Sequence, residues 1–208
     1  MKMPVTDELI VYKAKNGDLQ AYGALVERYQ HKVYNLAVKM VSDREDARDL
    51  TQDIFMQIFQ TLPRFRGDSS FSTWVYRVAS NKCLDFARKK KSEREKVNLS
   101  TFDLENLPSD SRGSPEEHAI RDDENHRLKR ALESLPKDYL IVIVLQHFQQ
   151  MSYKEIAEVL DVPVKTVATR LYRAKSMLKE RLMGGDAGAM PSGKAQPGQL
   201  HGKGISAL

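Results

Sequence analysis

Hydrophobic residues recur at intervals of three and four along most of this chain, which is the pattern of amphipathic helices. Over residues 19–29, for example, Leu25 and Tyr29 fall on one helix face, and Asp18 stands where an N-cap residue is expected. No segment shows the alternation of a half-buried strand. The predicted fold class is therefore all-α, with helices over residues 8–15, 19–29 continuing through 31–41, 44–62, 71–90, 127–134, 137–150, 153–160 and 164–182.

Short polar side chains mark where two of these helices begin. Ser42 or Asp43 can cap one of them, because a side-chain oxygen accepts hydrogen bonds from the free amides of a first turn. Ser70 or Ser72 can do the same for the helix over 71–90. That helix is predicted to pack inward through residues at helical spacing: Trp74, Val78, Leu84 and Ala87.

Two stretches interrupt the helical pattern. Residues 92–126 are polar, acidic and broken by Pro108, Gly113 and Pro115, which is typical of a flexible linker. Residues 184–208 are rich in glycine and nearly devoid of apolar side chains, so a disordered tail is expected. The predicted organisation is two helical domains joined by a linker, with boundaries at 1–91, 92–126, 127–183 and 184–208.

The second domain has the spacing of a helix-turn-helix. Ser152 and Glu155 form a capping box at the start of one helix, and Asp161-Val162-Pro163 makes the turn to the next. The outward face of the second helix then carries Lys165, Thr166, Thr169, Arg170, Tyr172 and Arg173. Arginine can grip guanine with two hydrogen bonds and lysine can meet phosphate, so this domain is predicted to read duplex DNA. The alternative is a helical hairpin whose cations are merely solvated.

A different nucleic-acid signature lies in the first domain. Between residues 64 and 82 aromatic side chains alternate with cations, and a basic run follows at 88–91. Rings that stack on unpaired bases and cations that hold phosphates are what a single strand requires. The candidate residues are Arg64, Phe65, Arg66, Trp74, Arg77 and Lys82. Trp74 is spaced from Val78 as a core residue would be, so its ring is equally consistent with packing.

The distribution of charge agrees with two nucleic-acid modules. The 208-residue chain has a formal net charge of +5. Residues 64–96 carry a net +6, residues 98–126 a net −6 and residues 164–182 a net +5. Ordinary solvated helix faces would also explain such blocks, but a mild basic excess favours a polyanionic partner.

Cys83 is the chain's one cysteine, so no internal disulfide or cysteine-based zinc site can form. Its place on an apolar helix face predicts a small core residue. No stretch approaches the 18 apolar residues of a membrane span, and Met1-Lys2-Met3-Pro4 lacks the apolar core of a signal peptide, so a cytoplasmic protein is expected.

Three other functional classes explain less of the sequence. No phosphate-binding loop, zinc-protease or hydrolase motif occurs, so no catalytic residue, metal site, cofactor or small-molecule substrate is predicted. A conventional helix-turn-helix regulator that binds duplex operator DNA would explain residues 152–178 but not the aromatic and basic segment at 65–82. An interaction adaptor would explain the acidic helix over 44–62 but would give both basic blocks no role.

From about Asp7 to Leu182 the chain resembles the extracytoplasmic-function (ECF) sigma factors of bacteria, particularly the sigma-E type. The motifs that carry the similarity are Asn16-Gly17-Asp18, Asp49-Leu50-Thr51-Gln52-Asp53-Ile54-Phe55, Phe65-Arg66-Gly67-Asp68 with Phe71-Ser72-Thr73-Trp74-Val75-Tyr76-Arg77, Leu135-Pro136 and Ser152-Tyr153-Lys154-Glu155-Ile156-Ala157. The resemblance implies a factor that binds core RNA polymerase and directs promoter-specific transcription initiation as part of a stress response. It also implies recognition of −10 and −35 elements and help in opening the DNA.

The resemblance further implies roles for particular residues. Phe65 is expected to capture a flipped −10 base and Asn81 to contact its neighbour. Phe65 is placed in a loop that contains Gly67, where no packing role in the core is expected for it. The residues that match the family's polymerase-binding surface, which docks on the β′ clamp helices, are Asp49, Gln52, Asp53 and Met56. They fall on the outer side of their helix, where a solvated acidic face is the alternative.

In the second domain, the positions that match the family's −35-reading residues are Thr169, Arg170, Tyr172 and Arg173. Ala168 departs from the pattern, because relatives often carry arginine or lysine there, so the −35 sequence is not inferred. The remaining implied partners are the polymerase β flap and an anti-sigma factor that clamps between the domains. The acidic linker is expected either to follow a positively charged channel of the polymerase or to act as a plain tether.

Overall fold

The computed structural model describes residues 6–98 and 126–183. Within these two ranges every regular element is helical, as the sequence pattern predicts. The interior of the predicted linker, residues 99–125, and the predicted tail, residues 184–208, lie outside the described residues. None of the described helices combines the length and the hydropathy that crossing a membrane requires.

The first half of the chain is a helical bundle. Its elements are α1 (Asp7–Lys15), α2 (Leu19–Met40), α3 (Arg44–Thr61), the 3₁₀ turn η1 (Leu62–Arg64) and α4 (Phe71–Asn98). Asp18 caps α2 by accepting from the Ala21 amide at 3.0 Å. The two open alternatives resolve to Asp43, which accepts from two amides of α3, and Ser70, which accepts from the Thr73 amide at 3.1 Å.

The second half begins with helical residues 126–133 and continues with α6 (Lys137–Ile143), the π-helical turn η2 (Val144–Phe148), α7 (Tyr153–Leu160) and α8 (Val164–Met183). The helix predicted over 137–150 therefore ends in a π turn. There the Gln149 amide donates to the carbonyl of Val144, five residues back, at 3.2 Å.

The predicted helix-turn-helix is confirmed, including its capping box. The Ser152 hydroxyl accepts from the Glu155 amide at 3.3 Å, and the Glu155 carboxylate accepts from the Ser152 amide at 2.8 Å. The Ser152 hydroxyl also donates to the Glu155 carboxylate at 2.7 Å, and this bond, together with the one from the Ser152 amide, holds the pKa of Glu155 below its usual range. Asp161 ends α7 in the left-handed conformation (φ 52°), which aspartate tolerates better than most residues.

Helix α4 differs from its prediction in length and in its buried face. It continues through Asn98, into the segment assigned to the linker, because residues 91–98 contain no proline or glycine and many good helix formers. The predicted inward residues Trp74, Val78, Leu84 and Ala87 are each only half-buried. The residues of α4 that are fully buried are Phe71, Thr73, Val75, Tyr76, Ala79, Ser80 and Cys83.

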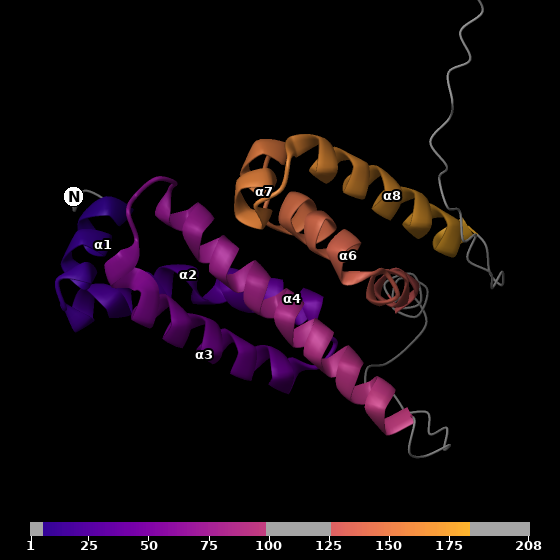
Figure 1. The fold of residues 1–208 in the computed structure, drawn as a ribbon, viewed down its shortest axis with the longest axis horizontal. Coiled ribbons are helices and arrows are strands. Elements are labelled where there is room, and N and C mark those ends of the chain that lie inside the picture. Colours follow the sequence, from indigo (N-terminus) through magenta and orange to yellow (C-terminus); the bar gives the residue numbers. More distant parts are fainter. Residues whose placement is uncertain (1–5, 99–125, 184–208) are drawn as a thin grey trace, which may run out of the picture.

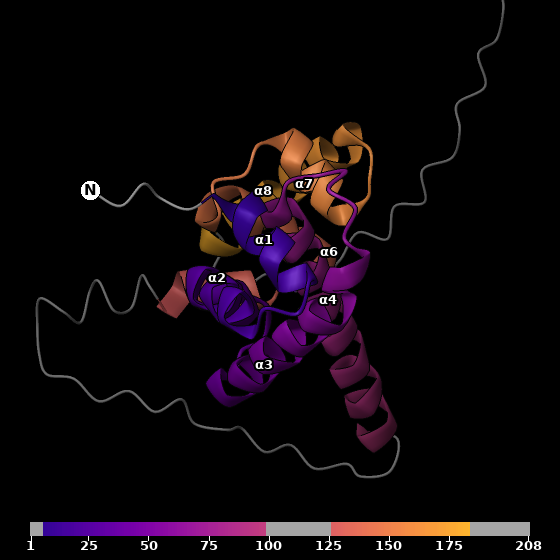
Figure 2. The ribbon, with the colours of Figure 1, turned by 90° about the vertical axis from the view of Figure 1, so that its left-hand side faces the viewer.

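The reason for this wider buried face is that α4 lies between the two halves. In Figures 1 and 2, α7 and α8 lie on the opposite side of α4 from α3, and α4 packs against both α3 and α7. The Tyr76 hydroxyl donates to the Gln149 side-chain oxygen at 2.5 Å. The Arg77 guanidinium donates twice to the carbonyl of Glu158, at 2.8 and 3.1 Å. Helix α4 therefore buries residues on two sides, which a single amphipathic stripe does not predict.

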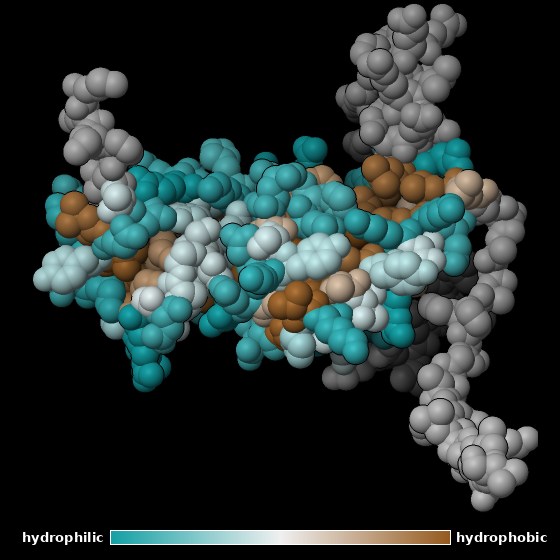
Figure 3. Space-filling model, turned by 90° about the horizontal axis from the view of Figure 1, so that it is seen from above, coloured by the Kyte–Doolittle hydropathy of each residue, from teal (hydrophilic) through white to brown (hydrophobic). Residues whose placement is uncertain are grey.

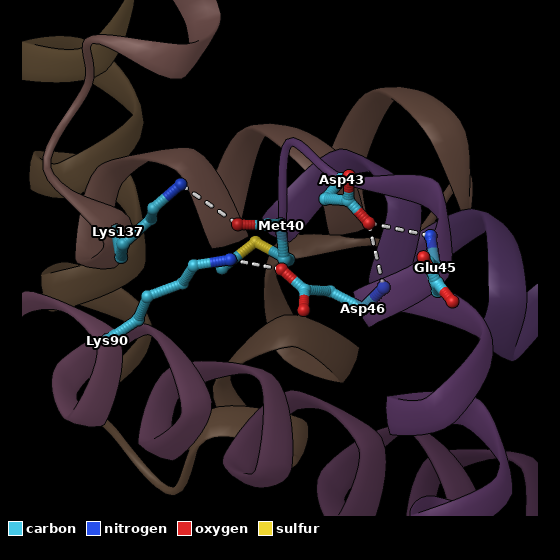
Figure 4. Close-up of polar contacts among 6 residues, drawn as sticks. All are labelled: Met40, Asp43, Glu45, Asp46, Lys90 and Lys137. Carbon is cyan, nitrogen blue, oxygen red and sulfur yellow. Dashed lines mark hydrogen bonds and ion pairs between the residues drawn. The ribbon is translucent and has the colours of Figure 1, made fainter. Parts of the chain in front are cut away.

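Two lysines strengthen the contact between the halves. The Lys137 ammonium donates to the carbonyl of Met40 at 2.9 Å, so a cation from the second half satisfies a free carbonyl at the C-terminus of α2 (Figure 4). The Lys39 ammonium lies 3.6 Å from the centre of the Phe148 ring, and burial lowers its pKa. Within the first half, Lys90 of α4 pairs with Asp46 of α3 (Figure 4).

We expect Ser152→Ala to lower the free energy of unfolding by about 1 kcal/mol, because it removes the N-cap acceptor of α7. Urea unfolding followed by circular dichroism measures this loss. Ser176→Ala is the matched control, since Ser176 is exposed within α8 and alanine is the better helix former. Equal stability of the two variants would show that the capping box contributes nothing.

Candidate polymerase and nucleic-acid interfaces

The four candidate polymerase-binding residues share the outer face of α3. Asp49, Gln52, Asp53 and Met56 are all exposed, and Met56 keeps 61% of its surface accessible. Leu50 and Ile54, between them in sequence, are buried in the core. The helix therefore presents two carboxylates, one amide and one thioether to a partner on a single rigid surface.

Next to this face lies an apolar groove that the sequence reasoning missed. The groove has a volume of about 370 Å³ and is lined by Tyr22, Gln52, Phe55, Met56, Phe59 and Gln60. The Tyr22 hydroxyl donates to the carbonyl of Phe55 at 2.5 Å, and its ring meets Phe59 edge-on at 4.9 Å. Burial raises the pKa of Tyr22 to about 12, so the hydroxyl stays protonated. The sequence feature that could have indicated this groove is the spacing of Phe55 and Phe59, which lie one helical turn apart. Both side chains are partly exposed in the structure.

The view from above shows how little apolar surface one side of the molecule exposes. Figure 3 shows a mainly hydrophilic face with separate small hydrophobic patches. Isolated apolar side chains are normal on a protein surface, whereas the groove brings Met56 together with the 47%-exposed Phe59.

Phe65 lies in the loop that follows η1, but its ring packs in an aromatic cluster. Its ring centre is 5.7 Å from that of Phe71 and 5.1 Å from that of Trp74, and Phe71 and Trp74 are 5.7 Å apart. All three contribute to the core of the first half or pack against it. The expectation that Phe65 has no packing role is therefore wrong, because the turn at η1 brings it back onto the start of α4. Trp74 is half-buried, so it packs and also keeps part of its ring accessible.

The remaining candidates for the −10 element differ in their solvent exposure and in their contacts with the rest of the protein. Arg64, Arg66 and Asn81 are exposed, and Lys82 is half-exposed. Trp74, Arg77 and Asn81 follow the helical spacing of one side of α4. Arg77, however, is held by the Glu158 carbonyl at a groove of about 620 Å³ beside the turn of the helix-turn-helix. These two bonds use two of the five N–H donors of the guanidinium.

The candidate duplex-reading residues lie on the accessible side of α8. Lys165, Thr169, Tyr172 and Arg173 are exposed, while Thr166 and Arg170 are half-buried. A groove of about 660 Å³ brings five of the six together with the start of α6, and its lining residues are Pro136, Asp138, Tyr139, Pro163, Lys165, Thr166, Thr169, Arg170 and Arg173. Tyr172 does not line this groove and is 77% exposed.

Two details limit what this helix can read. The Thr169 hydroxyl donates to the carbonyl of Lys165 at 2.9 Å, so in this conformation it can offer only an acceptor to a base. Ala168 is half-buried on the same helix and offers no polar group. The cations that line the groove beside α6 are Lys165, Arg170 and Arg173.

Cys83 is fully buried, and burial raises the pKa of its thiol to about 12, so it is a core residue as predicted. Among residues 6–98 and 126–183, no group of three or more histidine, cysteine, aspartate or glutamate side chains could hold a metal ion.

Comparison with known proteins gives similarities that cover both halves of the chain. The family described as Sigma-70 region 2 matches residues 25–93, and the family described as Sigma-70, region 4 matches residues 125–178. The RNA polymerase sigma-H factor of Pseudomonas aeruginosa is 32% identical over 180 residues, which cover 85% of this chain and 93% of that protein. The ECF RNA polymerase sigma-E factor of Escherichia coli K12 is 32% identical over 186 residues, which cover 88% and 97%.

A solved structure agrees in fold as well. CnrH, in its complex with the cytosolic domain of CnrY, matches with a TM-score of 0.63 and 26% identity. The match covers 85% of this chain and 97% of CnrH. The similarity thus extends across both helical halves.

The aromatic cluster gives a direct test of where Phe65 lies. Trp74 is the chain's one tryptophan, so its fluorescence reports on this cluster. We expect Phe65→Ala to shift the Trp74 emission to longer wavelength and to lower stability, since an aromatic pair contributes about 0.5–1.5 kcal/mol beyond its buried area. Phe59→Ala, in the groove beside α3, should leave the emission wavelength unchanged. An unshifted emission in Phe65→Ala would contradict the packing of Phe65 on Trp74.

Proposed function

The chain belongs to the extracytoplasmic-function sigma factors of the sigma-70 family, and from this membership we propose which of its surfaces carries out each part of initiation. It binds core RNA polymerase and promoter DNA and directs transcription initiation. The observation that carries this function is the order of the two matched regions, one on each helical half. We place its activity in the cytoplasm, where bacterial polymerase works.

The outer face of α3 is proposed to dock on core polymerase. Asp49, Gln52 and Asp53 offer charge and hydrogen-bonding groups, and the neighbouring groove offers apolar contact through Met56 and Phe59. An interface of this kind, an apolar centre with a polar rim, is how stable protein contacts are usually built. The acidic residues suit a basic helical surface such as the proposed β′ clamp helices, and the second half would contact the β flap.

The start of α4 is proposed to recognise the −10 element as a single strand. Phe65 and Trp74 supply aromatic faces, and the proposed polar contacts to the strand are Arg64, Arg66, Arg77, Asn81 and Lys82. The Phe65 ring is half-buried against its neighbours. Support by rigid neighbours suits a base-capturing ring, because a preordered ring loses little freedom on binding.

Helix α8 is proposed to read the −35 element as a closed duplex. Its candidates Lys165, Thr166, Thr169, Arg170, Tyr172 and Arg173 surround the groove beside α6 or lie exposed next to it. Recognition by the second helix of a helix-turn-helix in the major groove fits this placement. The missing cation at Ala168 reduces the contacts available, which favours recognition that depends strongly on Arg170 and Arg173.

The two halves are proposed to separate when the protein enters the polymerase. In the structure Arg77 is engaged with Glu158, and Tyr76 with Gln149. Both contacts lie in the half of α4 proposed to meet the −10 strand. Binding of core polymerase to each half would hold them apart and release Arg77 for DNA, at the cost of the contacts between the halves.

An anti-sigma partner that stabilises the inactive form is also proposed. The support is the similarity to CnrH, whose structure was solved with the cytosolic domain of another protein. A cavity of about 570 Å³ lies between the halves, lined by residues that include Lys39, Tyr76, Phe148 and Gln149. A protein segment seated there would add contacts to both halves. Co-purification from unstressed cells tests for such a partner.

We expect the Gln52→Ala, Asp53→Ala double variant to weaken binding to core polymerase by about 2 kcal/mol or more, because it truncates charged and polar groups at the proposed interface. Its helical signal and melting temperature should remain nearly unchanged, since both residues are exposed. Asp85→Ala, an exposed acid on α4, serves as the control. Unaltered affinity of the double variant for core polymerase would refute the proposed docking face.

A promoter with a pre-opened mismatch bubble separates the roles of α4 and α8. Phe65→Leu keeps an apolar side chain in the cluster but removes the face on which a base stacks, a contact worth about 1–3 kcal/mol. We expect it to slow open-complex formation on duplex DNA and the bubble to restore most of the rate. Arg173→Ala should weaken closed-complex binding by about 1–3 kcal/mol, and the bubble should not rescue it. Identical responses of the two variants would rule out this division of roles.

A further inference from the structure

Helix α1 makes a specific contact with the loop that carries Phe65. The Lys15 ammonium, at the end of α1, donates to the main-chain carbonyl of Phe65 at 2.6 Å, across 50 positions of sequence. Helix α1 lies outside residues 25–93, the part matched by the region 2 family. The contact is therefore a property of this chain that the family match does not describe.

A hydrogen bond to the Phe65 carbonyl can determine the position of the Phe65 ring, because the backbone leaves regular helical structure at this residue. The Phe65 amide donates to the Leu62 carbonyl at 3.0 Å and closes η1, after which residues 65–70 form no helix. Gly67 within this loop has φ +83°, a conformation that other residues rarely adopt. A charge-assisted bond to the Phe65 carbonyl fixes the peptide plane that follows the ring.

Helix α1 is itself held firmly enough to act as a support. The Asp7 carboxylate, in its first turn, accepts hydrogen bonds from Arg28 and from the Tyr29 hydroxyl of α2. Burial and the Asp7 carboxylate raise the pKa of Tyr29, so the donor stays protonated. The buried face of α1 consists of Ile10, Val11 and Ala14. Lys15 thus extends from a helix that is held at its first turn and along its buried face.

The neighbours of Phe65 connect to the same anchor. Tyr29, which bonds Asp7, meets the Phe71 ring edge-on at 5.5 Å, and Phe71 in turn packs against Phe65. The ring of Phe65 is therefore positioned from two directions. The aromatic cluster supports its side chain, and Lys15 holds its main chain.

We propose that α1 positions the base-capturing loop, with Lys15 as the positioning residue for Phe65. This proposal rests on the proposed role of Phe65 at the −10 element. Lys15 acts on the protein backbone and not on DNA, so its removal should change how well Phe65 discriminates between bases. A lysine that met a phosphate directly would instead add to affinity for every sequence and to the salt dependence of binding.

The test uses the full-length protein with core polymerase and a promoter selected from a randomised library with the wild-type holoenzyme. Open-complex formation is measured with each of the four bases at the flipped −10 position, over a series of salt concentrations. We expect Lys15→Met to slow open-complex formation on the preferred base about two- to tenfold, the range of a net hydrogen-bond contribution, and to flatten the preference among bases. The salt slope should stay unchanged. Lys15→Arg should keep most of the preference.

Two further variants make the outcome decisive. Lys13→Met removes an exposed cation from the same helix and should keep the wild-type base preference, and melting curves confirm that each variant is folded. An unchanged base preference in Lys15→Met, or a salt slope lower by about one, would overturn the positioning role. If Phe65→Leu impairs opening and Lys15→Met does not, this inference alone fails. If Phe65→Leu has no effect either, the proposed role of Phe65 fails and the inference with it.

Discussion

The structure depends on one helix that must pack on two sides. Helix α4 joins the core of the first half through Phe71 and pairs with α3 through Lys90, yet Tyr76 and Arg77 bind the second half. Small side chains make this possible, because Ala79, Ser80 and Cys83 are completely buried between larger neighbours. The residues proposed to bind the strand lie in the first half of this helix and in the turn before it.

This constraint links packing to function. The aromatic residues proposed to capture the −10 strand also hold α4 on the bundle, as the contacts of Phe65 with Phe71 and Trp74 demonstrate. Arg77 makes a contact between the halves and is also among the residues proposed to meet the strand. Recognition of the promoter and separation of the halves therefore draw on the same side chains, whereas α8 presents its cations on an accessible face in this packed form.

Local features were predictable from the sequence, and contacts between distant segments were not. The capping box of Ser152 and Glu155 and the alternation of buried Leu50 with exposed Asp49 follow from spacing within a few residues. The bond from Arg77 to Glu158 spans 81 positions and depends on where α4 and α7 cross, which helical periodicity does not determine. The same limit explains why the packing of Phe65 and the groove beside Met56 were missed.

A distance measurement tests whether the halves are packed together in the free protein and are parted by polymerase. Spin labels at exposed positions on α3 and α8, Arg48→Cys and Lys179→Cys, report the separation, and buried Cys83 should remain unlabelled. We expect one narrow distance distribution for the free protein and a longer distance when core polymerase is added. A broad distribution in the free protein, or a distance that core polymerase leaves unchanged, would contradict the proposed separation of packed halves.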